Sequence, residues 1–239
     1  MNLLELQGVH THIGAYHILH GVDLAVPKGQ LTMLLGRNGA GKTTTLRTIM
    51  GLWHASQGRV RFGDKDIAAM RTPQIAELGI AYVPENMGIF SDLTVKENML
   101  LAARGARNAA EIDDTRLKWI FKLFPAVEKF WNHPAGKLSG GQKQMLAVSR
   151  AIVEPRELLL IDEPSKGLAP VMINNMIDAF AELKASGVTI LLVEQNINFA
   201  QRLGDNVAVM DNGRVVHSGS MAAFSADAQL QQSLLGLAL

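Results

Sequence analysis

Residues 36–44 have the types and spacing of a phosphate-binding loop, G-x-x-x-x-G-K-[ST]. Glycines at three positions let the backbone approach an anion, because glycine adopts positive φ angles without steric cost. The loop N–H groups and the start of the following helix would then face that anion. The lysine would reach the β- and γ-phosphates, the next threonine would bind Mg²⁺ and the last threonine would contact the α-phosphate. The residues are Gly36, Arg37, Asn38, Gly39, Ala40, Gly41, Lys42, Thr43 and Thr44.

The elements on either side of this loop place it where a phosphate site requires it. An apolar run at residues 31–35 predicts a buried strand before the loop. Residues 45–50 carry apolar side chains at helical spacing and stop at Gly51, so they predict a helix after it. A chance glycine-rich turn would not need both neighbours, and we therefore favour the phosphate loop.

Two adjacent acids follow another apolar run. Leu158–Ile161 predicts a buried strand that ends in Asp162 and Glu163, and open α/β sheets bind their ligands at this edge. Residues 80–83 and 188–193 predict further buried strands of the same kind. The pattern favours an α/β fold with a mostly parallel sheet, and beside a phosphate loop the two acids are candidates for chemistry rather than a strand-end turn.

A glycine-flanked serine opens a further helix. Ser139 is a plausible N-cap for a helix over residues 142–153, which Pro155 cannot continue. Such a helix start is a second possible anion site. Alone, the pentapeptide at 138–142 is a weak signal.

The remaining segments predict the supporting structure. Residues 3–26 and 58–68 predict a small antiparallel lobe. Residues 94–130 predict a helical region within an insertion of about 60 residues, and a polar stretch at 108–114 joins two of its helices. Asp113 or Asp114 would cap the second helix. Residues 171–186 predict an amphipathic helix, and Asp211-Asn212-Gly213 predicts a hairpin turn.

The aromatic residues of the insertion and the apolar residues of the tail can each be interpreted in two ways. Aromatic residues in the insertion are expected to pack rather than to bind bases, because no basic residues interleave with them. The apolar tail at 222–239 is expected to be helical and to dock on the domain or on a partner. The aromatic residues are Phe121, Phe124, Phe130 and Trp131, and the apolar tail residues are Leu234, Leu235, Leu237 and Leu239.

Four histidines lie close together in the sequence. His10 and His12 would share one face of a strand, and His17 and His20 follow within the next segment. A metal site is one interpretation and a half-exposed sheet edge is the other. We favour the sheet edge, because no carboxylate joins the histidines at ligand spacing.

Composition excludes several classes of protein. The chain has 239 residues, a formal net charge of +1 and no cysteine, which argues against a nucleic-acid surface, a disulfide scaffold and thiolate metal sites. No apolar run approaches the roughly 20 residues of a spanning helix, so we expect a soluble chain. The first residues lack a basic-then-apolar pattern, and we expect no signal peptide.

Taken in order, the motifs resemble the nucleotide-binding domain of ATP-binding cassette (ABC) transporters over essentially the whole chain. Residues 36–44 resemble the Walker A loop, residues 158–163 resemble Walker B, and Leu138-Ser139-Gly140-Gly141-Gln142 resembles the family signature. Residues 83–85, 163–170 and 192–196 are most similar to the second ATPase subunit of branched-chain amino acid uptake systems.

The resemblance implies a single domain with a phosphate-loop NTPase core of the RecA type. The core would comprise residues 1–87 and 151–239, including the antiparallel β lobe at about 1–30 and 58–68. Residues 88–150 would form the helical subdomain that carries the signature.

The same resemblance implies roles for individual residues, with ATP and Mg²⁺ as cofactors. Lys42, Glu163 and Gln195 would be catalytic, with Glu163 orienting and deprotonating the attacking water. Thr43, Asp162 and Glu85 would hold Mg²⁺. Two cassettes would pair head to tail, so that each ATP lies between one loop and the partner's signature. The signature residues that would contact ATP are Ser139, Gly140, Gly141 and Gln142.

Four positions depart from the wider family pattern. Ile13 stands where an aromatic residue usually stacks on adenine, so either Tyr16 swings in or base stacking is weakened. Glu85 replaces a glutamine, and Gln195 replaces a histidine and cannot carry a proton at neutral pH. Ala169 replaces an aspartate. The subgroup often shows the last three replacements, so they do not indicate a dead enzyme.

The implied function is the ATPase subunit of a membrane importer for branched-chain amino acids or a related solute such as urea, an amide or an organic acid. The alternatives are an exporter ATPase of the lipopolysaccharide type and a soluble ABC ATPase without a membrane partner. The partners would be a second ATPase subunit (identical or related), two multi-span permease subunits and, indirectly, an external solute-binding protein, with no nucleic acid. Gly88, Ile89, Phe90 and residues 94–104 would receive a permease helix. The chain would be cytoplasmic and peripheral on the inner face of the plasma membrane.

Overall fold

A six-stranded sheet forms the centre of the computed structural model, which describes residues 1–103, 106, 108 and 111–236. The strand order is β10-β9-β3-β8-β7-β6, and every neighbouring pair is parallel except β9 and β10. Strands β3, β7 and β8 are buried along their whole length, which explains their unbroken apolar sequences. The predicted parallel sheet is confirmed. The bounds are β3 Leu31–Gly36, β6 Ile80–Val83, β7 Leu158–Asp162, β8 Thr189–Glu194, β9 Asn206–Asp211 and β10 Arg214–Ser220.

A second, antiparallel sheet forms the predicted β lobe, in the order β2-β1-β4-β5. Strand β4 begins at Ala55, three residues before the segment 58–68 that the sequence assigns to this lobe. Gly58 lies within the strand at φ 87°, where a Cβ would come within 2.3 Å of the Gly8 carbonyl oxygen, and the β1–β4 register shifts nearby. The glycine therefore marks a β-bulge. The bounds are β1 Asn2–Ile13, β2 Tyr16–Pro27, β4 Ala55–Phe62 and β5 Lys65–Asp66.

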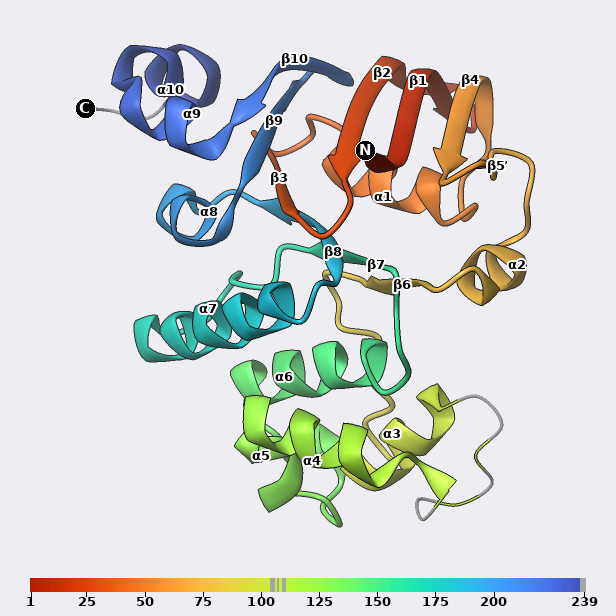
Figure 1. Cartoon of the computed structure of the whole chain (residues 1–239), viewed down its shortest axis with the longest axis vertical. Helices are drawn as coiled ribbons and strands as arrows, with labels where there is room; N and C mark the ends of the chain where they lie inside the picture. The colour runs from red at the N-terminus through yellow and green to blue at the C-terminus, as the bar shows by residue number, and fades with distance from the viewer. Residues whose placement is uncertain (104–105, 107, 109–110, 237–239) are drawn as a thin grey trace.

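Helices α3 to α6 gather at the end of the molecule opposite the antiparallel lobe (Figure 1). Helices α7 and α8 lie on the side of the central sheet that faces away from the antiparallel lobe, and α1 lies between the two sheets (Figure 1). The bounds are α1 Lys42–Ile49, α2 Thr72–Glu77, α3 Val95–Ala102, α4 Asp114–Leu123, α5 Pro125–Lys129, α6 Gly140–Ala151, α7 Pro170–Ala185, α8 Ile197–Leu203, α9 Met221–Ala226 and α10 Ala228–Leu235.

The helical insertion is more divided than the sequence pattern suggests. Asp113 caps α4 by accepting from the Arg116 N–H at 2.6 Å, which decides between the two candidate caps. The chain breaks again before α5, because Pro125 has no N–H with which to continue α4. The aromatic side chains of this region pack against the core, and Phe121 and Trp131 form an edge-to-face pair. The packing interpretation is therefore confirmed.

Two apolar cores lie on the two faces of the central sheet. One joins the sheet to the helices that surround α6 and α7, and the other joins it to α1 and the antiparallel lobe. In the tail, Leu234 and Leu235 pack against the first core, as expected, while Leu237 and Leu239 lie outside the described residues. No helix in the described part of the chain is both long and apolar enough to cross a membrane. The division at residues 88 and 150 stays a prediction.

Candidate functional site

The phosphate loop connects β3 to α1, as its sequence predicts. Gly36, Gly39 and Gly41 have φ angles of 149°, 81° and 105°, which side chains rarely adopt. At Gly36 a Cβ would also lie 2.3 Å from the Met210 carbonyl oxygen on β9. Backbone conformation therefore favours glycine at all three positions, and the close approach of β9 also requires it at Gly36.

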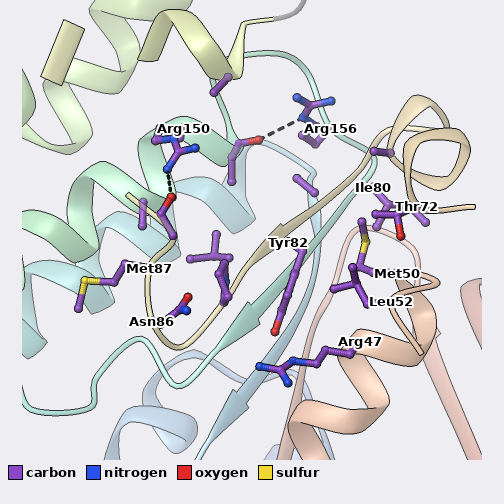
Figure 2. A pocket seen from close by; sticks show the side chains of 18 of the residues that line it. Arg47, Met50, Leu52, Thr72, Ile80, Tyr82, Asn86, Met87, Arg150 and Arg156 are labelled. Carbon is purple, nitrogen blue, oxygen red and sulfur yellow. Dashed lines mark hydrogen bonds between the residues drawn. The ribbon is translucent and has the colours of Figure 1, made fainter. Parts of the chain in front are cut away.

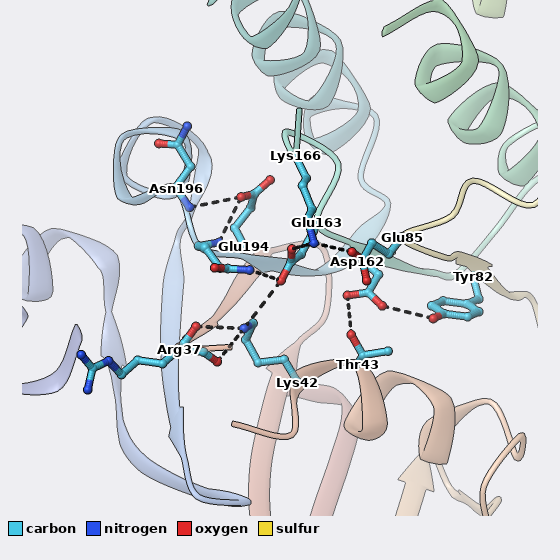
Figure 3. Close-up of polar contacts among 12 residues, drawn as sticks. Arg37, Lys42, Thr43, Tyr82, Glu85, Asp162, Glu163, Lys166, Glu194 and Asn196 are labelled. Carbon is cyan, nitrogen blue, oxygen red and sulfur yellow. Dashed lines mark hydrogen bonds and ion pairs between the residues drawn. The ribbon is translucent and has the colours of Figure 1, made fainter. Parts of the chain in front are cut away.

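Lys42 lies at the start of α1 with only 5% of its surface exposed. Its Nζ donates to the carbonyl oxygens of Gly36 at 2.9 Å and Arg37 at 3.1 Å, and lies 3.7 Å from Glu163 Oε1 (Figure 3). Burial lowers the pKa of Lys42, and the nearby charges of Glu163 and Asp162 oppose that shift. The lysine is thus a partly desolvated cation beneath the loop that is predicted to hold phosphate.

Asp162 is fully buried at the tip of β7, and both of its carboxylate oxygens have partners. Thr43 Oγ1 donates to Oδ1 at 3.0 Å, and the Tyr82 hydroxyl donates to Oδ2 at 3.3 Å (Figure 3). Burial raises the pKa of Asp162 despite these hydrogen bonds, and burial beside Asp162 raises the pKa of Tyr82 to about 12. Sequence reasoning missed Tyr82, although its place on the strand that neighbours β7 is a usable signal.

Glu163 adopts a strained backbone conformation, with φ 47°. Its N–H donates to the Val193 carbonyl oxygen at 2.9 Å, which anchors the residue to the end of β8. Its Oε1 accepts from Gln195 Nε2 at 2.5 Å (Figure 3). The structure therefore brings the predicted base, the predicted switch residue and Lys42 together at the carboxyl ends of β7 and β8.

Glu194 is a buried acid that sequence reasoning did not select. Its carboxylate accepts from the N–H groups of Ser165 at 2.9 Å, Gln195 at 3.1 Å and Asn196 at 3.2 Å. Burial raises its pKa, and these bonds oppose the shift. The residue ties the loop after β7 to the loop after β8; an acid directly after an apolar strand was the available signal.

Glu85 follows β6 and is joined to the site by a lysine. Lys166 Nζ lies 2.5 Å from Glu85 Oε1 and 3.6 Å from Glu163 Oε2 (Figure 3). Sequence reasoning had no ground to select Lys166, because Lys166, Glu85 and Glu163 come close only when the loops after β6 and β7 are placed side by side.

The signature residues form a separate structure at the start of α6. Ser139 accepts from the Gln142 N–H at 3.4 Å, and Gln142 Oε1 accepts from the Ser139 N–H at 2.9 Å, so the two form a capping box. A Cβ at Gly141 would lie 2.6 Å from Met172 Cε, so only glycine fits there without a shift. Within the described residues, hydrogen bonds connect the phosphate loop to Asp162, and none connects it to this signature.

Ile13 and Tyr16 face each other across the tip of the β1–β2 hairpin. Tyr16 is 75% exposed, and nothing in the described chain holds its ring. The roles suggested for these two residues stay predictions.

The four histidines gather on one face of the same hairpin. His10 Nδ1 lies 3.0 Å from His17 Nε2, and His17 also contacts the rings of His12 and His20. Desolvation, followed by the charges of His17 and Arg214, lowers the pKa of His20. Among the described residues, no group of three or more potential ligands could hold a metal ion, which favours the sheet-edge interpretation.

A glycine-rich loop between strand and helix, a buried lysine beneath it and two adjacent acids at the end of β7 define a phosphate-loop ATPase. Comparison with known proteins narrows this class. Residues 19–166 match the ABC transporter family, and the chain belongs to that family.

The relatives cover nearly the whole chain. The high-affinity branched-chain amino acid transport ATP-binding protein BraG of Pseudomonas aeruginosa is 38% identical over 234 residues, which span 98% of this chain and 100% of BraG. The probable branched-chain amino acid transport ATP-binding protein LivF of Archaeoglobus fulgidus is 37% identical over 85% of this chain and 86% of LivF.

Solved structures agree with the fold. The ADP conformation of MJ1267, an ATP-binding cassette of an ABC transporter, superimposes with a TM-score of 0.82 at 26% identity and covers 99% of this chain and 100% of its own. The dimeric structure of MJ0796, a bacterial ABC transporter cassette, has a TM-score of 0.81 at 25% identity and covers 91% of this chain and 98% of its own.

Proposed function

We propose that this chain is the ATP-hydrolysing subunit of an importer for branched-chain amino acids or a related small polar solute. The observation that carries the ATPase assignment is the convergence of Lys42, Asp162 and Glu163 at the sheet edge beneath the phosphate loop. The transport assignment is supported by similarity to BraG over the full length of both chains.

The residues divide the work of phosphoryl transfer. The loop N–H groups and Lys42 bind the phosphates, and Lys42 exchanges its bonds with Gly36 and Arg37 for phosphate oxygens. Glu163 accepts a proton from the attacking water, and Gln195, which now donates to Glu163, donates to the γ-phosphate instead. Water must reach Glu163 on the open side of the site, where Lys166 is the exposed neighbour.

The chemistry of the donor set fits Mg²⁺, which prefers oxygen ligands. The Thr43 hydroxyl and the Asp162 carboxylate lie 3.0 Å apart, and Glu85 is close enough for its charge to affect Asp162. When bound, Mg²⁺ neutralises charge on the phosphate oxygens. Thr43, Asp162 and Glu85 would hold it.

A second cassette would complete the site. At the start of α6, Ser139 and Gly140 are exposed, Gln142 is half-exposed and Gly141 is buried against Met172. A helix start of this kind binds an anion that the partner's loop holds from the other side. The MJ0796 dimer supports such pairing. The second subunit is either a copy of this chain or a related chain.

A groove that borders the candidate site at Tyr82 fits the membrane partner. Tyr82, Asn86 and Met87 line it from β6 and the following loop, and Arg47 and Leu52 line it from α1 and beyond (Figure 2). Gly88 and Leu101, within the stretches expected from the sequence, also line it. Ile89 and Phe90 do not line it, and residue 104 lies outside the described residues. Sequence reasoning missed the Arg47–Leu52 side.

Exposed apolar side chains around this groove support docking of an amphipathic helix. Leu52 and Phe90 are each 49% exposed, and Leu101 is 60% exposed. Arg150 of α6 holds the adjoining loop, because its Nη1 donates to the Gly88 carbonyl oxygen at 2.5 Å and its guanidinium stacks on Phe90. One of the two permease subunits would dock here, the other would dock on the second cassette, and together they would hold the chain on the inner face of the plasma membrane. An external solute-binding protein would act through those subunits.

The alternatives have less support. An exporter ATPase is not favoured by relatives such as BraG and LivF, which are branched-chain amino acid transport proteins. A nucleic-acid partner is not favoured by a net charge of +1.

Purification from solubilised membranes tests the assignment. We expect the tagged chain to recover a multi-span permease with a second ATPase, and membrane vesicles to take up labelled leucine only with internal ATP. Leu101→Asp should prevent recovery of the permease while ATP binding persists. Recovery of no membrane protein by the wild-type chain would contradict the transporter assignment, and uptake of urea in place of leucine would change the substrate.

A further inference from the structure

Two lysines contact the carboxylates of the candidate site, and only one of them, Lys42, belongs to a recognised motif. Lys166 is the other: it lies three residues after Glu163, in the loop between β7 and α7. Its Nζ contacts Glu85 at 2.5 Å and Glu163 at 3.6 Å, so it joins the loop after β6 to the loop after β7. The side chains of Glu85 and Glu163 come from opposite sides of the ammonium group (Figure 3).

The charge balance around Asp162 explains why a cation is useful here. Glu163 and Glu85 both repel the Asp162 carboxylate, and both raise its pKa. Lys42 is buried and contacts Glu163, but no ion pair in the described chain joins it to Glu85. Lys166 therefore provides the positive charge that allows Glu85 to approach Glu163 before a nucleotide arrives.

Mg²⁺ and the Lys166 ammonium compete for one carboxylate. A divalent cation held by Asp162 and Glu85 would repel a lysine that stays on Glu85. The Lys166–Glu85 pair is well exposed, with side-chain exposures of 58% and 43%, and exposed ion pairs are weak enough to exchange.

We propose that Lys166 is a positioning residue that holds Glu85 beside Glu163 in the nucleotide-free cassette and competes with Mg²⁺ for Glu85. The proposal rests on the Mg²⁺ site assigned above. Release of Glu85 to Mg²⁺ leaves Lys166 on Glu163 alone, beside the place where the attacking water must enter.

Two opposite changes distinguish this role from simple structural support. In Lys166→Gln, binding of ATP in EDTA should weaken by about two- to fivefold, because the site loses a positive charge beside Glu85 and Glu163 while ATP is an anion. Binding of Mn²⁺, used as a spectroscopic probe for Mg²⁺ on the ATP-loaded chain, should tighten by about the same factor, because Glu85 is free. Fluorescent ATP titration and Mn²⁺ electron paramagnetic resonance measure the two constants without turnover.

Variants of the partner residues complete the test. In a Glu85→Gln background, Lys166→Gln should no longer tighten Mn²⁺ binding, and Lys166→Arg should behave like the wild type. Lys122→Gln is the matched control, since Lys122 pairs with Glu182 at 2.7 Å with similar exposures of 72% and 41%, remote from the carboxylates. Thermal unfolding checks that every variant is folded.

The outcomes separate the two proposals. Three results would overturn the proposed competition. ATP and Mn²⁺ binding could both be unchanged in Lys166→Gln, both could weaken or both tighten, or the effect of Lys166→Gln on Mn²⁺ binding could be the same with and without Glu85→Gln. A wild-type chain that binds no ATP would overturn the proposed function instead.

Discussion

Two helix starts in this molecule are suited to phosphate, and they differ in nearly every other respect. The start of α1 is buried and charged, with Lys42 beneath it and Asp162 and Glu163 opposite. The start of α6 carries no charged side chain within Ser139–Gln142 and is closed by its own capping box. From this difference we propose that the first can bind a nucleotide alone, whereas the second is half of a site and depends on another cassette.

The largest effect should come from Glu163→Gln, which keeps the shape of the α1 site and removes its base. We expect ATP turnover to fall by about 10²–10⁴-fold while ATP still binds, because general-base catalysis contributes that much. Dimers loaded with ATP should then accumulate, as measured by light scattering during size-exclusion chromatography. Turnover at the wild-type rate would remove Glu163 from the mechanism.

Lys42→Ala should weaken the nucleotide affinity of the α1 site itself. The phosphates lose a buried cation and its charge-assisted hydrogen bonds, so the dissociation constant for ATP should rise by about 10–100-fold. Isothermal titration calorimetry measures the constant. A matched change outside the site, Lys122→Ala, should leave it unchanged, and unaltered affinity in Lys42→Ala would mean that the loop does not hold the phosphates.

Ser139→Ala should separate the two helix starts. Loss of the cap should reduce the free energy of unfolding by about 1 kcal/mol, and ATP binding to the isolated cassette should stay at the wild-type level. ATP-dependent pairing in the Glu163→Gln background should weaken, as analytical ultracentrifugation would detect. Weaker binding of ATP by the monomer would contradict the half-site interpretation.

The smallest effect concerns pH. Burial lowers the pKa of Lys42 from 10.5, so the folded chain loses this proton at a lower pH than the unfolded chain. ATP affinity should therefore decline as pH rises, before pH 10.5 is reached, and Lys42→Arg should remove the decline because arginine stays charged. Titrations from pH 7 upward measure it. A decline that persists in Lys42→Arg would assign the effect to another group.

The sequence predicts the parts of this molecule that depend on neighbours along the chain. Loop 36–44, the Asn212-Gly213 turn and the Ser139 cap follow from local backbone requirements, and the structure has all three. Tyr82, Glu194 and Lys166 could not be selected with the same certainty, since each acts on a residue that is distant in sequence. The break before α5 was missed because apolar spacing continues across Pro125 while the backbone hydrogen bonds do not.

Helix α6 has a property that neither of its ends shows alone. It begins after Ser139 of the signature, and near its other end Arg150 donates a hydrogen bond to the Gly88 carbonyl oxygen in the loop beside the groove. An α-helix of this length behaves as a stiff rod with a rise of about 1.5 Å per residue. A permease that tilts this helix would reorient Ser139 and Gly140 at its opposite end. Movement of the permease in the membrane would then change the contact of these residues with the ATP that a neighbouring cassette holds.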